Sequence, residues 1–243
     1  MENILYDTLT LRSCHCDMFE AWRPSSILET MQETAGTHSA KLGLPWDVMT
    51  EMGLAWILSR VQVEMTRLPH VTETVHIETY PTLTRHLFYP RSHIFRDAQG
   101  QEIGRAESLW MVLDLNTRRV TRSAEVTAHL PENRDLQPAL ALPATVKPLE
   151  GPAQVHTMQP LFTDFDVNRH VNNTKYLDWC LNALGMEVMQ ERCVTSFCVN
   201  YDAEIRHGDQ VRTELCLIDD HFSYCGFGES KRHFGVSGHL TGR

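Results

Sequence analysis

The chain has 243 residues, 42% hydrophobic and 22% charged, which suits one large globular domain or two modest ones and excludes general disorder. Its formal net charge of −9 argues against nucleic acid as a partner, because phosphate binding needs a concentrated basic face. Seven cysteines without a CxxC pair, no signal peptide and no apolar run of membrane-spanning length predict reduced thiols and a cytoplasmic location.

The first half of the chain predicts one helix and then several strands. Apolar residues recur at helical spacing over residues 25–43, where Ser25 or Ser26 can cap the start and Gly43 can form the end. Strands rich in β-branched and aromatic residues follow at 55–65, 74–82, 87–97 and 104–115, with hairpin turns at 97–101 and 115–119.

The second half repeats this plan after a break. Residues 131–152 carry five prolines and little periodicity, which predicts a linker. A helix is expected over residues 172–187, with Asn172 as its N-cap. The expected strands of this half lie at 153–162, 194–205, 209–219, 221–231 and 234–242.

Because helices do not alternate with strands, the order predicts an α+β protein. A single helix followed by a curved antiparallel sheet suits the hotdog arrangement, in which the sheet wraps around the helix. We therefore expect a tandem (double) hotdog, with an N-terminal domain at 1–130, a linker at 131–152 and a C-terminal domain at 153–243. The alternative is one large mixed sheet, which periodicity alone does not separate from the first arrangement.

The densest group of polar residues lies at 164–176, just before the second helix. Asp166, Asn168 and His170 alternate, so in an extended loop their side chains project the same way. An aspartate can orient an imidazole, an amide can donate a hydrogen bond and a histidine can move a proton, which together suit acyl transfer. The alternative is that these residues only build a turn and a helix cap.

The string DFDVNRHVNNTKYLDW resembles the signature of the acyl-ACP thioesterases of plant plastids and bacteria. The resemblance extends in order along nearly the whole chain. It includes ILETMQETAGTHSAKLG in the first helix, LAWILSRVQVEMTRLPHVTETVHIET in the next strand pair, RAESLWMVLDLNTRRVTR, and VNYDAEIRHGDQV, which is similar to the segment that carries the family's catalytic glutamate.

The resemblance implies a double hotdog fold and hydrolysis of fatty acyl-ACP to a fatty acid and the ACP thiol, with no cofactor and no metal. It places Asp166, Asn168, His170 and Glu204 at the catalytic positions. Glu204 is expected to activate a water or to attack the carbonyl itself. Ile205 stands where many plant members have a cysteine, so no cysteine nucleophile is available there.

Two further groups of residues are expected to meet the substrate. Asn168 and the backbone N–H groups near Val171 and Asn172 are expected to stabilise the oxyanion. Met31, Ala35 and Trp110 are candidates for the lining of an acyl tunnel shaped by the first domain, and plain core packing is the alternative for each. The matching first-domain loop at 17–24 has no Asn or His in this pattern, so we expect one active site per chain.

Three rival functions use the same fold. An acyl-CoA thioesterase or a hydratase of acyl thioesters would bind the same pantetheine arm, and a non-enzymatic regulator would bind the acyl thioester without consuming it. The expected partner is an acyl carrier protein, and the chain is expected to be a monomer or a homodimer. The Cys14-His15-Cys16 run invites a metal site, but ordinary strand residues are the preferred interpretation.

Overall fold

The computed structural model describes residues 3–243, and the chain forms two compact units, Met1–Pro143 and Ala144–Arg243. Unit 1 contains β1 (Leu5–Thr10), η1 (Ser13–His15), α1 (Pro24–Lys41), α2 (Trp46–Glu51), β2 (Leu54–Met65), β3 (Thr74–Pro81), β4 (Tyr89–Arg96), β5 (Glu102–Asp114), β6 (Arg119–Thr121) and α3 (Ala124–His129). Unit 2 contains β7 (Gln154–Met158), η2 (Phe162–Asp164), α4 (Lys175–Leu184), α5 (Met186–Glu191), β8 (Arg192–Tyr201), β9 (Val211–Ile218), β10 (His221–Phe227) and β11 (Arg232–Gly242).

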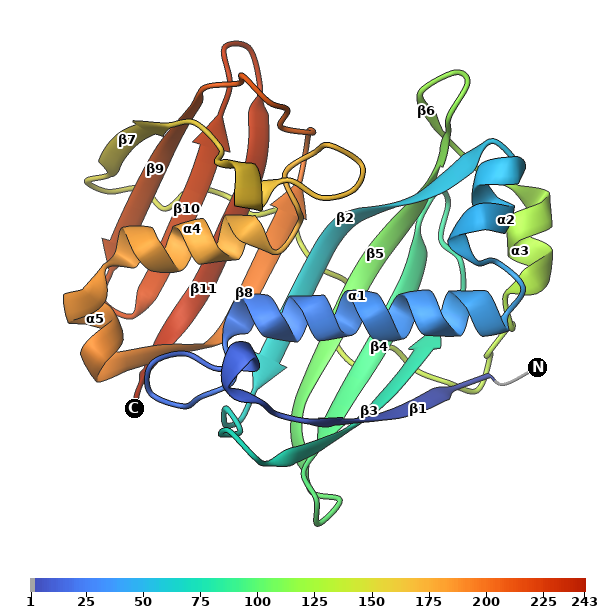
Figure 1. Cartoon of the computed structure of the whole chain (residues 1–243), viewed down its shortest axis with the longest axis horizontal. Helices are drawn as coiled ribbons and strands as arrows, with labels where there is room; N and C mark the ends of the chain where they lie inside the picture. The colour runs from blue at the N-terminus through green and yellow to red at the C-terminus, as the bar shows by residue number, and fades with distance from the viewer. Residues whose placement is uncertain (1–2) are drawn as a thin grey trace. The chain divides into compact units, whose positions relative to one another are not determined.

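The two units share one topology. The strands of unit 1 follow the order β1-β3-β4-β5-β2, and those of unit 2 follow the corresponding order β7-β9-β10-β11-β8; every one of these pairings is antiparallel. In each unit a helix, α1 or α4, runs across one face of the sheet (Figure 1). This confirms the α+β class and the hotdog arrangement, with two such units in tandem along the sequence.

Helix α1 forms where the apolar spacing predicts it. Ile27, Leu28 and Met31 are buried against the sheet, and full burial of such a side chain stabilises a fold by about 1.5–3 kcal/mol. The start differs from the expectation: Pro24 is the first helical residue, so the serines that follow it lie in the first turn and do not cap it. The predicted end is confirmed, since Gly43 follows with a φ of +86°.

Helix α4 begins later than predicted. The N-cap is Thr174, so Asn172 is not the cap. Asn172 instead organises the preceding turn, because its Oδ1 accepts hydrogen bonds at 3.0 Å from both the backbone N–H and the hydroxyl of Thr174. Gly185, with a φ of +84°, ends α4 and separates it from the unpredicted helix α5.

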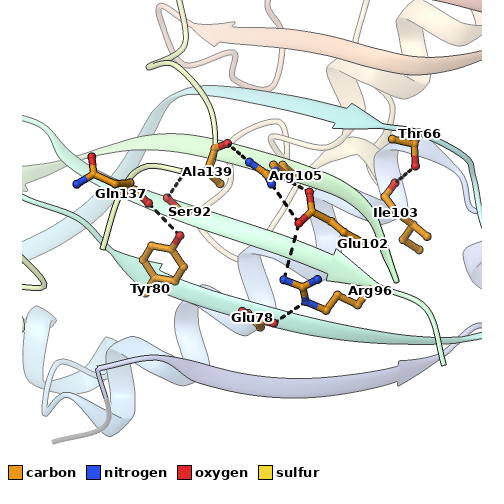
Figure 2. Close-up of polar contacts among 10 residues, drawn as sticks. All are labelled: Thr66, Glu78, Tyr80, Ser92, Arg96, Glu102, Ile103, Arg105, Gln137 and Ala139. Carbon is orange, nitrogen blue, oxygen red and sulfur yellow. Dashed lines mark hydrogen bonds and ion pairs between the residues drawn. The ribbon is translucent and has the colours of Figure 1, made fainter. Parts of the chain in front are cut away.

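The first part of the predicted proline-rich linker lies on the sheet of unit 1. On β4, Arg91 and His93 face α1, so Ser92 between them faces the opposite side of the sheet. The contacts on that side join Tyr80 Oη to the Gln137 carbonyl at 3.0 Å, the Ala139 N–H to Ser92 Oγ at 3.1 Å and Arg105 Nη1 to the Ala139 carbonyl at 3.4 Å (Figure 2). The segment around Ala139 is therefore held to the sheet by side chains of three strands.

Candidate active site

The polar cluster predicted as an extended loop is a tight turn. Asp166 N–H donates to the His170 carbonyl at 2.9 Å, and the two flanking residues, Phe165 and Val171, form an antiparallel bridge. Arg169 has a φ of +63°, a left-handed conformation that no glycine at this position announces. The expectation that alternate side chains project together from an extended loop is therefore wrong, because the backbone reverses inside the motif.

Asp166 has a structural role in this turn. Its Oδ1 accepts hydrogen bonds from the backbone N–H groups of Asn168 at 2.8 Å and His170 at 3.3 Å. A carboxylate that accepts from N–H groups two and four residues onward fixes the backbone of both. Asp166 thus positions Asn168 and His170 through their main chain, whereas the sequence predicts an aspartate that holds one of their side chains.

The loop after β8 brings Glu204 to this turn. Val171 N–H donates to the Ile205 carbonyl at 3.0 Å, and His170 forms an antiparallel bridge with Arg206. Because neighbouring bridge positions place side chains within reach of one another, Glu204 Oε2 lies 3.3 Å from His170 Nε2. Two residues that are 34 positions apart in the sequence therefore form one acid–base pair.

Arg206 is a third residue of this group, beside Glu204 and His170, and it is not predicted from the sequence. Its Nη2 donates to the same Glu204 Oε2 at 2.9 Å. The side chains are partly open to solvent, with exposed fractions of 26% for His170, 37% for Glu204 and 61% for Arg206. The sequence signal that could have indicated the Arg206–Glu204 contact is their spacing, because residues i and i+2 of an extended segment lie on one side.

Tyr176, in the first turn of α4, lies close enough to Asp166 and Glu204 for their charges to act on it. It is buried, and its ring packs against Phe234 with centroids 4.5 Å apart. Burial raises the pKa of its hydroxyl, and the negative charges of Asp166 and Glu204 raise it further. The phenol is therefore neutral and lies near both carboxylates.

The backbone N–H groups expected as oxyanion donors are already in use. The Val171 N–H donates to Ile205, and the Asn172 N–H donates to the Asp164 carbonyl at 2.8 Å. Both N–H groups therefore have partners within the protein in this structure, and their role as oxyanion donors stays a prediction. Asn168 is different, because its side chain is exposed at the tip of the turn and its amide can donate.

Unit 1 contains the same turn without these side chains. Asp17 Oδ1 accepts from the N–H groups of Phe19 at 2.9 Å and Ala21 at 3.1 Å, as Asp166 does in unit 2. Glu20 has a φ of +64°, the counterpart of Arg169. The backbone of the turn therefore needs the aspartate and does not need an asparagine or a histidine.

The loop that meets the turn is repeated as well. In unit 1 the Trp22 N–H donates to the Pro69 carbonyl at 2.8 Å, and Ala21 forms an antiparallel bridge with His70. Superposing these contacts on unit 2 gives the correspondences Phe19 with Asn168, Ala21 with His170, Leu68 with Glu204, and His70 with Arg206. Both units thus share the backbone contacts of this turn and loop, but only unit 2 carries the side chains of Asn168, His170 and Glu204.

This repeat separates positioning from chemistry in a testable way. We expect Asp166→Ala and Asp17→Ala each to lower the free energy of unfolding by about 1–2 kcal/mol, because each removes two hydrogen bonds to backbone N–H groups. Only Asp166→Ala should also lower turnover, by about 10²-fold, since it displaces Asn168 and His170. Urea unfolding and steady-state kinetics measure the two effects. Equal activity losses in both variants would show that the turn of unit 2 has no special role.

The residues predicted to line an acyl tunnel do not form one group. Met31 and Ala35 are buried on α1 of unit 1, whereas Trp110 is partly buried on β5 and packs beside another cluster of the core. Near Met31 the same helix contacts polar groups, since Thr34 Oγ1 lies 3.4 Å from His93 Nε2. Burial and the nearby Arg91 charge lower the pKa of His93 to about 3, so this imidazole is neutral.

The cysteines offer no evident nucleophile at the cluster. All seven are free thiols, and Ile205, next to Glu204, is fully buried. Cys180 lies inside α4, where burial raises the pKa of its thiol well above the ordinary value. A thiol with a raised pKa is a poor source of thiolate, so Glu204, His170 and Asn168 stay the candidate chemical groups of the site.

Comparison with known proteins gives a consistent result. The model of the acyl-ACP thioesterase N-terminal domain matches residues 4–130, and that of the C-terminal domain matches residues 149–232. A chloroplastic oleoyl-acyl carrier protein thioesterase of Coriandrum sativum is 29% identical over 208 residues, which cover 76% of this chain and 55% of that protein. The chain therefore spans about half the length of the curated relatives it matches.

Two solved structures share the fold of this protein over nearly the whole chain. An acyl-ACP thioesterase from Bacteroides thetaiotaomicron has a TM-score of 0.87 at 22% identity and covers 98% of both chains. A 12:0-ACP thioesterase from Umbellularia californica has a TM-score of 0.88 at 19% identity and covers 100% of this chain and 99% of its own. With family models over both units, and with the fold shared along its length, the chain belongs to the acyl-ACP thioesterase family.

Proposed function

We propose that this protein hydrolyses the thioester of fatty acyl-acyl carrier protein and releases the fatty acid and the carrier thiol, as a step of fatty acid biosynthesis. The observation that carries the proposal is the Glu204–His170 contact of 3.3 Å on a turn whose counterpart in unit 1 has neither group. The relatives support the substrate class, since they are named as oleoyl- and palmitoyl-acyl carrier protein thioesterases.

The chemistry needs a base, an oxyanion donor and a proton for the leaving group. In the proposed step Glu204 takes a proton from water while the water oxygen bonds to the thioester carbonyl carbon. The exposed Asn168 amide donates to the developing oxyanion. The C–S bond then breaks, and the proton that Glu204 took from water passes through His170, 3.3 Å away, to the thiolate, which is a good leaving group. A direct attack by Glu204 on the carbonyl uses the same carboxylate and is the alternative first step.

The substrate is also proposed to meet unit 1. Met31, Ala35 and Trp110 stay candidates for the acyl tunnel, and the neutral His93 near Met31 marks where an acyl chain would encounter polar atoms. Along residues 3–243, no helix combines the length and apolar character needed to cross a membrane. The cytoplasmic location and the monomeric or dimeric state stay predictions.

A panel of substrates tests the proposal. Wild type is to be incubated with acyl carrier protein thioesters of medium and long chains, with the matching acyl-CoA thioesters and with an enoyl thioester, and free fatty acid is measured. Preference for the carrier thioesters supports the proposal. Preference for acyl-CoA would indicate an acyl-CoA thioesterase, hydration of the enoyl group would indicate a hydratase, and binding without turnover would indicate a non-enzymatic acyl sensor.

A further inference from the structure

Glu204 shares one carboxylate oxygen between two donors from different segments. Its Oε2 lies 3.3 Å from His170 Nε2 on the turn and accepts a hydrogen bond of 2.9 Å from Arg206 Nη2 on its own loop. The carboxylate is thereby held from two sides.

The fold does not require the Arg206 side chain. The Arg206 N–H is held by Asp209 Oδ2 at 2.8 Å, which shapes the loop through the backbone alone. Unit 1 forms the same loop with His70, whose N–H is held by Glu73 Oε1 at 2.7 Å. The guanidinium is 61% exposed, and an ion pair in such a place contributes little to folding stability. A structural explanation for this arginine is therefore weak.

The guanidinium has a clear chemical effect on Glu204. A fixed positive charge 2.9 Å away favours the ionised carboxylate, which is the form that can act as a base or a nucleophile. The planar donor also restricts rotation of the carboxylate, and a displacement of about 1 Å at a reacting group can cost about 10²-fold in rate.

We infer that Arg206 is a positioning residue of the hydrolytic site: it holds Glu204 ionised and oriented toward the thioester. This inference rests on the proposed function. Arg206 is assigned no contact with substrate, so it acts on kcat through Glu204 and leaves KM nearly unchanged.

The variants Arg206→Gln, Arg206→His and Arg206→Lys test the inference on fatty acyl-acyl carrier protein. The histidine variant carries the residue that unit 1 has at this position, so the loop should fold. We expect kcat to fall about 10- to 100-fold in the glutamine and histidine variants at constant KM. The acid limb of their pH–rate profile should move to higher pH, and the lysine variant should recover part of both effects.

Arg212→Gln is the matched control. Arg212 pairs with Glu214, also two residues away, through Nη1 and Oε1 at 2.5 Å on β9, and its side chain is 52% exposed. Loss of that pair should leave kcat and the pH profile unchanged. If Arg206→Gln keeps wild-type kcat and pH profile, or changes KM alone, while wild type is active and Glu204→Ala is inactive, the inference is wrong and the proposed function stands. An inactive wild type would overturn both.

Discussion

Glu204→Gln should lower kcat by about 10²–10⁴-fold while leaving the fold intact. The substitution preserves size and can still form hydrogen bonds with His170 and Arg206, but the amide can neither accept a proton nor attack the carbonyl. The side chain is 37% exposed, so the free energy of unfolding should change by less than about 1 kcal/mol. Single-turnover hydrolysis of fatty acyl-acyl carrier protein measures the chemical step, and urea unfolding measures stability.

Glu214→Gln provides the comparison for this prediction. Glu214 is a partly buried glutamate of the same unit that also pairs with an arginine, at 2.5 Å, and it lies on β9 away from the turn. Its substitution should leave turnover unchanged. Wild-type single-turnover rates in a folded Glu204→Gln protein would remove Glu204 from the chemistry, whichever of its two roles is considered.

Glu107 gives the largest expected effect on stability. It is fully buried on β5, and its Oε2 accepts a hydrogen bond of 2.6 Å from Ser92 Oγ beneath the segment around Ala139. Burial raises the pKa of Glu107 from 4.5 to about 7, although the Ser92 hydrogen bond opposes the shift. The folded protein therefore binds this proton more tightly than the unfolded chain does.

The sign of the pH effect follows from that difference. The contribution of Glu107 to stability is greatest below pH 4.5, falls as pH rises through the interval between 4.5 and about 7, and levels off above it. The loss attributable to this carboxyl is about 3 kcal/mol. Glu107→Gln keeps a partner for Ser92 and carries no charge, so it should be more stable than wild type by up to about 3 kcal/mol at pH 8, and nearly equal to it at pH 4.

Urea unfolding at several pH values checks this expectation. Glu102→Gln on the same strand is the control, because its carboxylate pairs near the surface with Arg105 and, at 3.8 Å, with Arg96, and its loss should change stability by less than about 1 kcal/mol (Figure 2). If the difference between Glu107→Gln and wild type were the same at pH 4 and pH 8, the carboxyl would not be the group that titrates.

The sequence predicted most of the secondary structure because local patterns determine it. Alternating polarity and turn residues located β2 to β5 in unit 1 and the strands of unit 2, and apolar spacing located α1, whereas β1 and β6 were not predicted. The predicted helix boundaries were wrong where a helix cap or a helix break depends on a single residue. Pro24 rather than a serine begins α1, and Gly185 divides the second helical segment into two.

The structure brings together His170 and Glu204, which the motif predicted as site residues, but the predicted local geometry is wrong. Arg169 has a positive φ without being a glycine, so the sequence predicts an extended loop where the structure has a turn. The Val171 N–H was expected to face the substrate, but its partner, Ile205, lies 34 residues away. The same distant loop brings Glu204 to His170, a contact that depends on tertiary structure and that no local pattern contains.

The repeat of the turn explains why the motif is informative. Asp17 and Asp166 make the same pair of backbone hydrogen bonds, so the aspartate alone indicates a turn. The groups found only in unit 2 are those that can move a proton or stabilise an oxyanion. Two matching frameworks in one chain therefore distinguish the residues required for folding from those available for catalysis.

The most direct measurement is fatty acid release from an acyl carrier protein thioester by wild type and by the triple variant Asn168→Phe, His170→Ala, Glu204→Leu. This variant places the three side chains of unit 1 on the turn and loop of unit 2, so it should fold. The account predicts rapid release by wild type and none above background by the folded variant. Wild-type release by the folded variant would show that hydrolysis occurs elsewhere in the protein.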